Sequence, residues 1–241
     1  MMKAKVGAAA LAVAFSGAVF TGGASAGTIN LQNATGESSP FGTPAWAREV
    51  AYTINGDTER SIAGLFRLED RDSGEGILAW CVELLQDLVL PGEFRMNQTI
   101  PGAATMANLN KLFNQSYDMI LDEQVGVKKE KKAAGFQLAI WEIITDSEDA
   151  SGLDLEDGEF VVIDGDGNTE EGVIGNASFY LSRLDQAADT TDYELTIWNS
   201  GRSQDLVTAE ETVAAIPVPA AGLLLLSGLA GFGALRRRRK S

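Results

Sequence analysis

Short apolar segments of strand length lie on either side of a long helical region in this chain. The apolar positions favour strands over Trp46–Ile54, Ser61–Leu68 and Ile77–Leu85, and Asn55-Gly56-Asp57 is typical of a tight turn between the first two. Residues 27–45 are rich in Gly, Ser, Thr, Pro and Asn and predict an irregular lead-in. We therefore expect an antiparallel meander of three strands, with Cys81 in the last one.

The central region repeats apolar residues at helical intervals. This spacing predicts helices over Ala104–Phe113, Ser116–Asp122 and Val127–Thr145, of which the last is the strongest. Strand character then returns in short segments. The later strand candidates are Phe160–Ile163, Phe179–Leu184, which fits a helix equally well, Tyr193–Trp198 and Asp205–Thr208.

Strands before and after a block of helices predict the fold class. This order indicates an α+β fold, mainly an antiparallel β-sandwich or barrel-like domain, with a helical insertion between Cys81 and the late strands. One domain over residues 46–210 is long enough to hold these elements around a sizeable core.

The strongest helix carries one polar residue on its apolar face. In KKAAGFQLAIWEII, residues 131–144, helical spacing places Gln137 on the same face as Ile140 and Trp141. A buried amide without partners costs about 1–3 kcal/mol. Either hydrogen bonds meet that cost, or the amide has been chemically changed.

Both ends of the chain have the pattern of processing signals. Residues 1–26 combine a basic start, an apolar run and the site Ala24-Ser25-Ala26, which predicts a secretory signal peptide cut before Gly27. A first transmembrane helix is the weaker alternative, because glycines and the small-residue site interrupt the run. At the other end, Ile216–Leu235 is a run of uncharged, mostly apolar residues long enough to cross a bilayer, and Arg236–Lys240 forms a basic stop.

This tail resembles the exosortase-type sorting signals of Gram-negative bacteria, which join a VPxPA motif to a helix and arginines. The matching residues are Ile216, Pro217, Val218, Pro219 and Ala220, with isoleucine in place of the usual valine. The resemblance implies export, recognition by an exosortase-type processing enzyme at the inner membrane, cleavage near the prolines, and attachment or release at the cell surface. A permanent single-pass membrane anchor is the alternative.

Charge and composition exclude several classes of function. Between the two end signals the chain holds 12 basic and 34 acidic residues, a net charge of −22, which repels nucleic acid and suits an exported soluble domain. The chain has no histidine, which removes Ser-His-Asp and Cys-His catalysis and imidazole metal sites. It also lacks phosphate-binding glycine loops, and the spacing of its acids singles out no hydrolytic pair. We expect no cofactor.

Cys81 is the only cysteine of the chain. A lone accessible thiol outside the cell oxidises or cross-links, so it must be buried, paired with another chain or masked. A thiol held against a glutamine carboxamide can displace ammonia and form an internal thioester. If Cys81 and Gln137 meet in this way, one bond accounts for both the thiol and the buried amide.

Here the chain resembles the bacterial surface thioester domains over roughly Trp46 to Thr208. The segments that carry the resemblance are WCVE, which includes Trp80 and Cys81, and FQLAIWE, which includes Gln137 and Trp141; Gln204 follows Trp198 in the closing hairpin. The resemblance implies that Cys81 donates the sulfur and that Gln137 supplies the acyl carbon, which an amine on a surface or matrix macromolecule attacks. Trp80 and Trp141 are expected to pack and to exclude solvent. Such a protein captures one partner covalently and is not an enzyme.

Two alternatives to this interpretation are compatible with the sequence. Cys81 and Gln137 can be ordinary core residues in a non-covalent extracellular matrix or envelope structural protein. Calcium binding is also conceivable, since Asp164, Asp166 and Asn168 have D-x-D-x-N spacing. Thr169 takes the place of the usual glycine there, so a tight acidic turn is the favoured interpretation and we expect no metal.

Overall fold

The computed structural model describes residues 27–97, 102–147, 152–165, 168–184 and 193–212. The signal peptide and the sorting tail predicted above lie outside these residues. The strands are β1 (Thr28–Asn33), β2 (Ala47–Ile54), β3 (Asp57–Gly64), β4 (Phe66–Asp70), β5 (Gly76–Cys81), β6 (Gly92–Asn97), β7 (Phe160–Val162), β8 (Tyr193–Ser200) and β9 (Ser203–Glu211). The helices are α1 (Ala103–Ser116), α2 (Asp118–Leu121), α3 (Val127–Asp146) and α4 (Glu171–Arg183).

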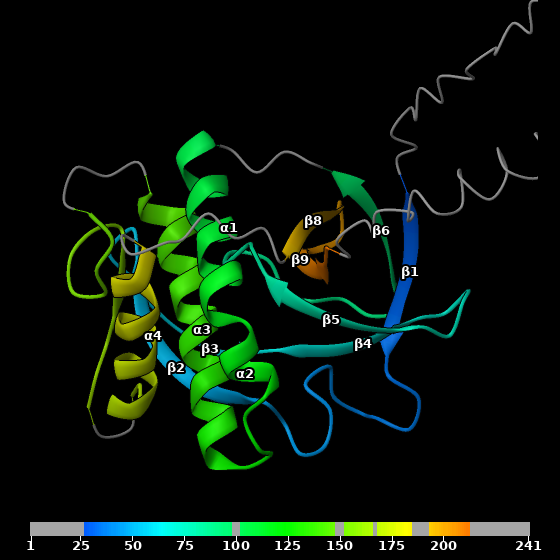
Figure 1. Cartoon of the computed structure of the whole chain (residues 1–241), viewed down its shortest axis with the longest axis horizontal. Coiled ribbons are helices and arrows are strands. Elements are labelled where there is room, and N and C mark those ends of the chain that lie inside the picture. Colours follow the sequence, from blue (N-terminus) through cyan, green and yellow to red (C-terminus); the bar gives the residue numbers. More distant parts are fainter. Residues whose placement is uncertain (1–26, 98–101, 148–151, 166–167, 185–192, 213–241) are drawn as a thin grey trace, which may run out of the picture.

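The fold is α+β, as predicted, and its main β element is a barrel. Six antiparallel strands close in the order β1-β4-β5-β9-β8-β6, and a separate three-stranded sheet has the order β3-β2-β7. The barrel lies to one side of the helices, and β5 runs from the barrel toward them (Figure 1). Of the two architectures considered, the barrel is therefore the correct one.

The first strand of the barrel was not predicted. Residues 27–45 were expected to be irregular, but Thr28–Asn33 forms β1, which pairs with both β4 and β6 and closes the barrel. Only Ile29 and Leu31 carry the apolar alternation in this segment, and Leu31 is fully buried. Two apolar positions are too short a signal to outweigh the turn-forming residues that follow them.

The predicted meander is divided between two sheets. The Asn55-Gly56 turn is confirmed, with both residues at positive φ, and it joins β2 to β3. The single strand expected over Ser61–Leu68 is instead two strands, because β3 ends at Gly64 and β4 begins at Phe66 in the barrel. A Cβ atom on Gly64 would lie 2.3 Å from the carbonyl oxygen of Trp46, so only glycine fits at this crossing.

The helical insertion also differs from its predicted limits. Strand β6 was not predicted, and it belongs to the barrel, so the insertion begins after Asn97 rather than after Cys81. It contains the three predicted helices, strand β7 and α4. The ambiguous segment Phe179–Leu184 belongs largely to α4.

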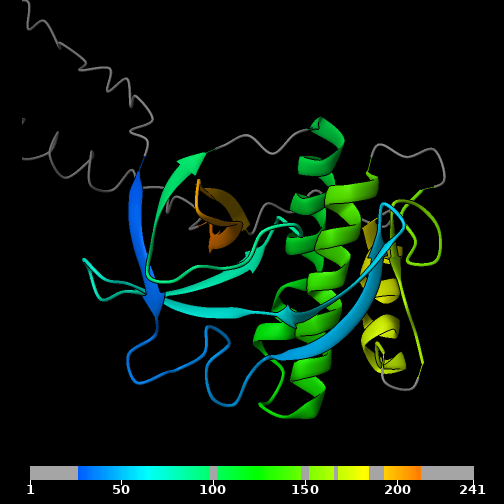
Figure 2. The ribbon, with the colours of Figure 1, turned by 180° about the vertical axis from the view of Figure 1, so that it is seen from behind.

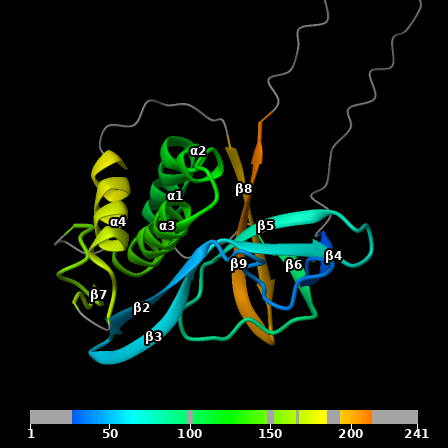
Figure 3. The same ribbon diagram turned by 90° about the horizontal axis from the view of Figure 1, so that it is seen from below.

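Helix α3 is the central element of the insertion. Every residue from Ala133 to Ile143 is buried, as expected for a helix covered on all sides. It lies between the β2–β3 hairpin and α1 (Figure 3), and the view from behind shows the hairpin crossing it (Figure 2). Helix α4 approaches it closely at Gly135, where a Cβ atom would lie 2.8 Å from the carbonyl oxygen of Val173.

An aromatic cluster fixes the end of β5 against the helices. Trp80 is fully buried, and its ring centroid lies 4.7 Å from that of Phe136 in α3 and 6.2 Å from that of Tyr117. Phe113 of α1 packs on Phe136 from another side, with centroids 5.0 Å apart. Since Trp80 directly precedes Cys81, this cluster sets where Cys81 meets α3.

Within the part of the chain that the structure describes, no helix combines the length and the apolar character needed to span a membrane.

Candidate functional site

Cys81 and Gln137 lie in contact at the junction of the barrel and α3. Cys81 is the last residue of β5 and is 3% exposed, while Gln137 lies in the middle of α3 and is 1% exposed. The two positions are 56 residues apart in sequence. The structure therefore brings together the two residues that the sequence singled out.

The Gln137 carboxamide is paired with the backbone of Cys81 at both of its polar atoms. The Cys81 N–H donates to Oε1 of Gln137 at 3.0 Å, and Nε2 of Gln137 donates to the Cys81 carbonyl oxygen at 2.8 Å. These bonds, which we call the amide clamp, satisfy the buried amide. They also fix its carbonyl group beside Cys81.

The clamp occupies the place of a missing strand. The β4–β5 ladder ends at the pair Phe66 and Ala79, two residues before Cys81. On the other edge of β5, the Val82 N–H donates to the Asp205 carbonyl oxygen in β9. The backbone groups of successive strand residues face opposite edges. The Cys81 N–H and C=O therefore face the edge of β5 that pairs with β4 only as far as Ala79. Gln137 fills that gap with a side chain.

The Cys81 sulfur has a separate set of partners. Sγ lies 2.9 Å from the carbonyl oxygen of Glu83 and 3.1 Å from Oε1 of Gln204, a residue of β9 that is 8% exposed. The thiol donates toward these two oxygens. Gln204 was noted in the sequence only through the resemblance, because its place beside Cys81 arises from the β5–β9 pairing in the barrel.

Burial keeps the Cys81 thiol protonated. Loss of solvent raises the pKa of Cys81 to about 12, and the negative charges of Glu83 and Asp205 act in the same direction. Hydrogen bonding by the Glu83 backbone works against this rise in pKa. Near neutral pH the group is therefore a thiol, shielded from oxidants and alkylating agents.

Trp141 lies one helical turn after Gln137 and is buried against Tyr52 and Phe160. Its indole N–H has no hydrogen-bond partner among the described residues. Trp80 lies in the aromatic cluster described above. Both tryptophans are buried.

Of the three calcium candidates, Asp164 and Asn168 lie within the described residues. Asp166 lies outside them, and Oδ1 of Asn168 accepts a hydrogen bond from the Arg60 guanidinium at 2.8 Å. Nδ2 of Asn168 donates to the carbonyl oxygen of Asp164. No group of three or more His, Cys, Asp or Glu side chains that could hold a metal is found where the structure is described.

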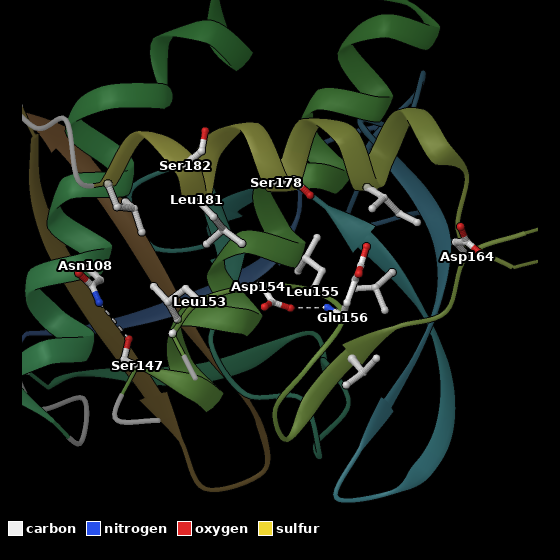
Figure 4. A pocket seen from close by; sticks show the side chains of 15 residues that line it. Asn108, Ser147, Leu153, Asp154, Leu155, Glu156, Asp164, Ser178, Leu181 and Ser182 are labelled. Atoms are coloured by element: carbon white, nitrogen blue, oxygen red, sulfur yellow. Dashed lines mark hydrogen bonds between the residues drawn. The ribbon is translucent and has the colours of Figure 1, made fainter. Parts of the chain in front are cut away.

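A cavity of about 900 Å³ lies elsewhere, between α4 and the loop that precedes β7 (Figure 4). Ser178, Leu181 and Ser182 of α4 line one side of it, and Asn108 donates a hydrogen bond to Ser147 at its edge. Neither Cys81 nor Gln137 lines this cavity. The candidate site is thus a closed contact between two elements rather than an open pocket.

Comparison of the chain with protein-family models, with curated proteins and with solved structures finds no match.

Replacing Gln137 with alanine is expected to lower the free energy of unfolding by about 2–5 kcal/mol, because the buried Cys81 N–H and C=O both lose their partner. Urea unfolding measures the change. Gln124→Ala is the matched control, since Gln124 is an exposed glutamine of the loop before α3 and its loss should change stability by less than about 0.5 kcal/mol. Equal effects of the two substitutions would contradict the amide clamp.

Proposed function

We propose that Cys81 and Gln137 form an internal thioester through which the protein captures an amine-bearing partner covalently. The observation that carries the proposal is the amide clamp, which holds the Gln137 carbonyl group against the residue that bears the thiol. The resemblance of WCVE and FQLAIWE to the surface thioester domains supports the same pairing.

Thioester formation needs no group from outside the protein. The Cys81 sulfur attacks Cδ of Gln137, the C–N bond breaks, and the thiol proton leaves with the amide nitrogen as ammonia. The Cys81 N–H already donates to Oε1 and would stabilise the negative charge that develops there. The Gln204 oxygen accepts from the thiol and positions the sulfur before the attack.

Capture of the partner breaks the thioester bond and frees the Cys81 sulfur. The nitrogen of a primary amine attacks the Gln137 acyl carbon, the C–S bond breaks, and a proton from the amine is transferred to the Cys81 sulfur. An amide bond then joins Gln137 to the partner. Because the thioester is consumed, each molecule reacts once and the protein is not an enzyme.

Burial of the site supports a thioester that survives until its partner arrives. Cys81, Gln137 and Gln204 are each at least nine-tenths buried, which limits hydrolysis by water. We place the protein at the cell surface or outside the cell, exported by its signal peptide and attached through its tail, with an exosortase-type processing enzyme and the inner membrane as partners along that route. Its target is an amine-bearing surface or matrix macromolecule.

One observation favours a second candidate, a non-covalent matrix or envelope structural protein. Both polar atoms of the Gln137 amide are already paired with backbone groups, so the fold accommodates an intact glutamine. In that case Cys81 is a buried core residue, and nothing reacts with amines.

Reaction with methylamine distinguishes the two candidates. The thioester predicts a methylamide on Gln137, located by peptide mass spectrometry, and one new free thiol per molecule after the protein is unfolded. The structural protein predicts a thiol that is already free and no adduct on any glutamine, and that result would overturn the proposed function.

A further inference from the structure

The segment that follows Cys81 presents apolar side chains to solvent. In residues 82–91, Leu84, Leu88 and Leu90 pack against the core, whereas the alternate side chains face outward. Leu85 is 76% exposed and Val89 is 49% exposed. With the exposed Asp87 between them, these three residues form a surface that we call the outer stripe (Leu85, Asp87 and Val89).

The loop that carries the outer stripe is hydrogen-bonded to Gln204, the residue whose side chain contacts the Cys81 sulfur. The Gln204 N–H donates to the Asp87 carbonyl oxygen at 3.0 Å, and the Val89 N–H donates to Oγ of Ser203 at 2.9 Å. The loop is therefore held by hydrogen bonds along the beginning of β9, next to Gln204.

A hollow of about 760 Å³ continues from the stripe. Val89 and Pro91 line it from the loop, and the turn between β8 and β9 lines it from the other side with Arg202 and Ser203. An extended chain lying on the stripe would continue into this hollow. The stripe and the hollow share Val89, so together they suit a peptide segment better than an isolated amine.

Acidic groups on this side of the molecule complement a cationic amine. Asp87 is exposed on the stripe itself, and the Asp205 N–H donates to a carboxylate oxygen of Glu83 next to the sulfur. Leu85 and Val89 offer no side-chain hydrogen-bonding groups, so they suit apolar side chains better than sugar hydroxyls. A lysine with apolar neighbours fits both features, because its ammonium group complements the acidic side chains and its neighbours can pack on Leu85 and Val89.

We infer that the outer stripe is the docking surface for the target of the thioester, and that the target is an extended protein segment whose lysine is flanked by apolar residues. This inference rests on the proposed function. It adds the recognition step, in which the stripe holds the segment while its lysine reaches the Gln137 acyl carbon.

The test compares rates of adduct formation with two capped peptides, in which a single lysine is flanked by leucines or by serines. The purified protein should react faster with the leucine peptide. Leu85→Ser and Val89→Ser should each slow that reaction by about tenfold, as expected for the loss of one apolar contact, and should leave the serine peptide and methylamine unaffected. Ile62→Ser is the control, because Ile62 is an exposed apolar residue of β3, outside the stripe.

The methylamine reaction separates the two possible failures. If methylamine reacts but both peptides react at equal rates, or an amino sugar or polyamine reacts faster than the leucine peptide, the docking inference is overturned and the thioester stands. If methylamine gives no adduct, the proposed function fails and the inference fails with it.

Discussion

Replacing Cys81 with alanine is expected to abolish methylamine labelling completely while the barrel remains folded. The amide clamp uses only the backbone of Cys81, so alanine keeps both hydrogen bonds to Gln137. The substitution removes the sulfur and its contacts with Glu83 and Gln204. The substitution therefore removes the reaction with amines without removing the hydrogen bonds that support the fold. Mass spectrometry measures the labelling, and circular dichroism checks the fold.

The matched comparison is the double variant C81A/Q137A against C81A alone. Neither protein can form a thioester, so the difference between their free energies of unfolding isolates the clamp, which we expect to contribute about 2–5 kcal/mol. Persistent labelling of Gln137 in C81A would show that another group activates this glutamine. That outcome would exclude Cys81 as the sulfur donor.

Replacing Trp80 with alanine is expected to lower the free energy of unfolding by about 3–5 kcal/mol, the range for a large aromatic side chain removed from a packed core. Trp80 is fully buried and joins β5 to α3 and to Tyr117 through its ring contacts with Phe136 and Tyr117. Its removal leaves a cavity next to the amide clamp, where the barrel strand that carries Cys81 packs on the helix that carries Gln137.

Urea unfolding of Trp80→Ala measures this loss of stability. The midpoint urea concentration should fall, while the dependence of the unfolding free energy on urea concentration should not change. Phe179→Ala is the control, because the Phe179 side chain is exposed on α4 and its loss should change stability by less than about 0.5 kcal/mol. A small effect of Trp80→Ala, similar to that of the control, would contradict its role in fixing the site.

Local patterns were sufficient to predict α1, α2 and α3 and to single out Cys81 and Gln137, whereas α4 was missed except for the ambiguous segment Phe179–Leu184. Helix α3 was predicted within a residue of its observed end, because its apolar spacing persists over five turns. A lone cysteine and a single amide on an apolar helix face are both costly unless they are partnered, so each pointed to a special environment. The structure places them in contact, through the backbone of Cys81 rather than through its sulfur.

Contacts between segments that are distant in the sequence could not be predicted from local patterns. Strand β1 has a weak local signal and becomes a barrel strand only because β4 and β6 lie on either side of it. The break between β3 and β4 depends on the close approach of Gly64 in β3 to Trp46, the residue that precedes β2. Gln204 reaches Cys81 only through the register of β9 against β5. None of these contacts leaves a periodic pattern in the chain.

The intact mass of the purified, untreated protein tests the central claim most directly. Formation of the Cys81–Gln137 thioester predicts a mass lower by one ammonia than the sequence of the processed chain requires, and C81A should show no such deficit. A full mass for the wild-type protein, with Cys81 recovered as a free thiol after unfolding, would contradict the covalent link.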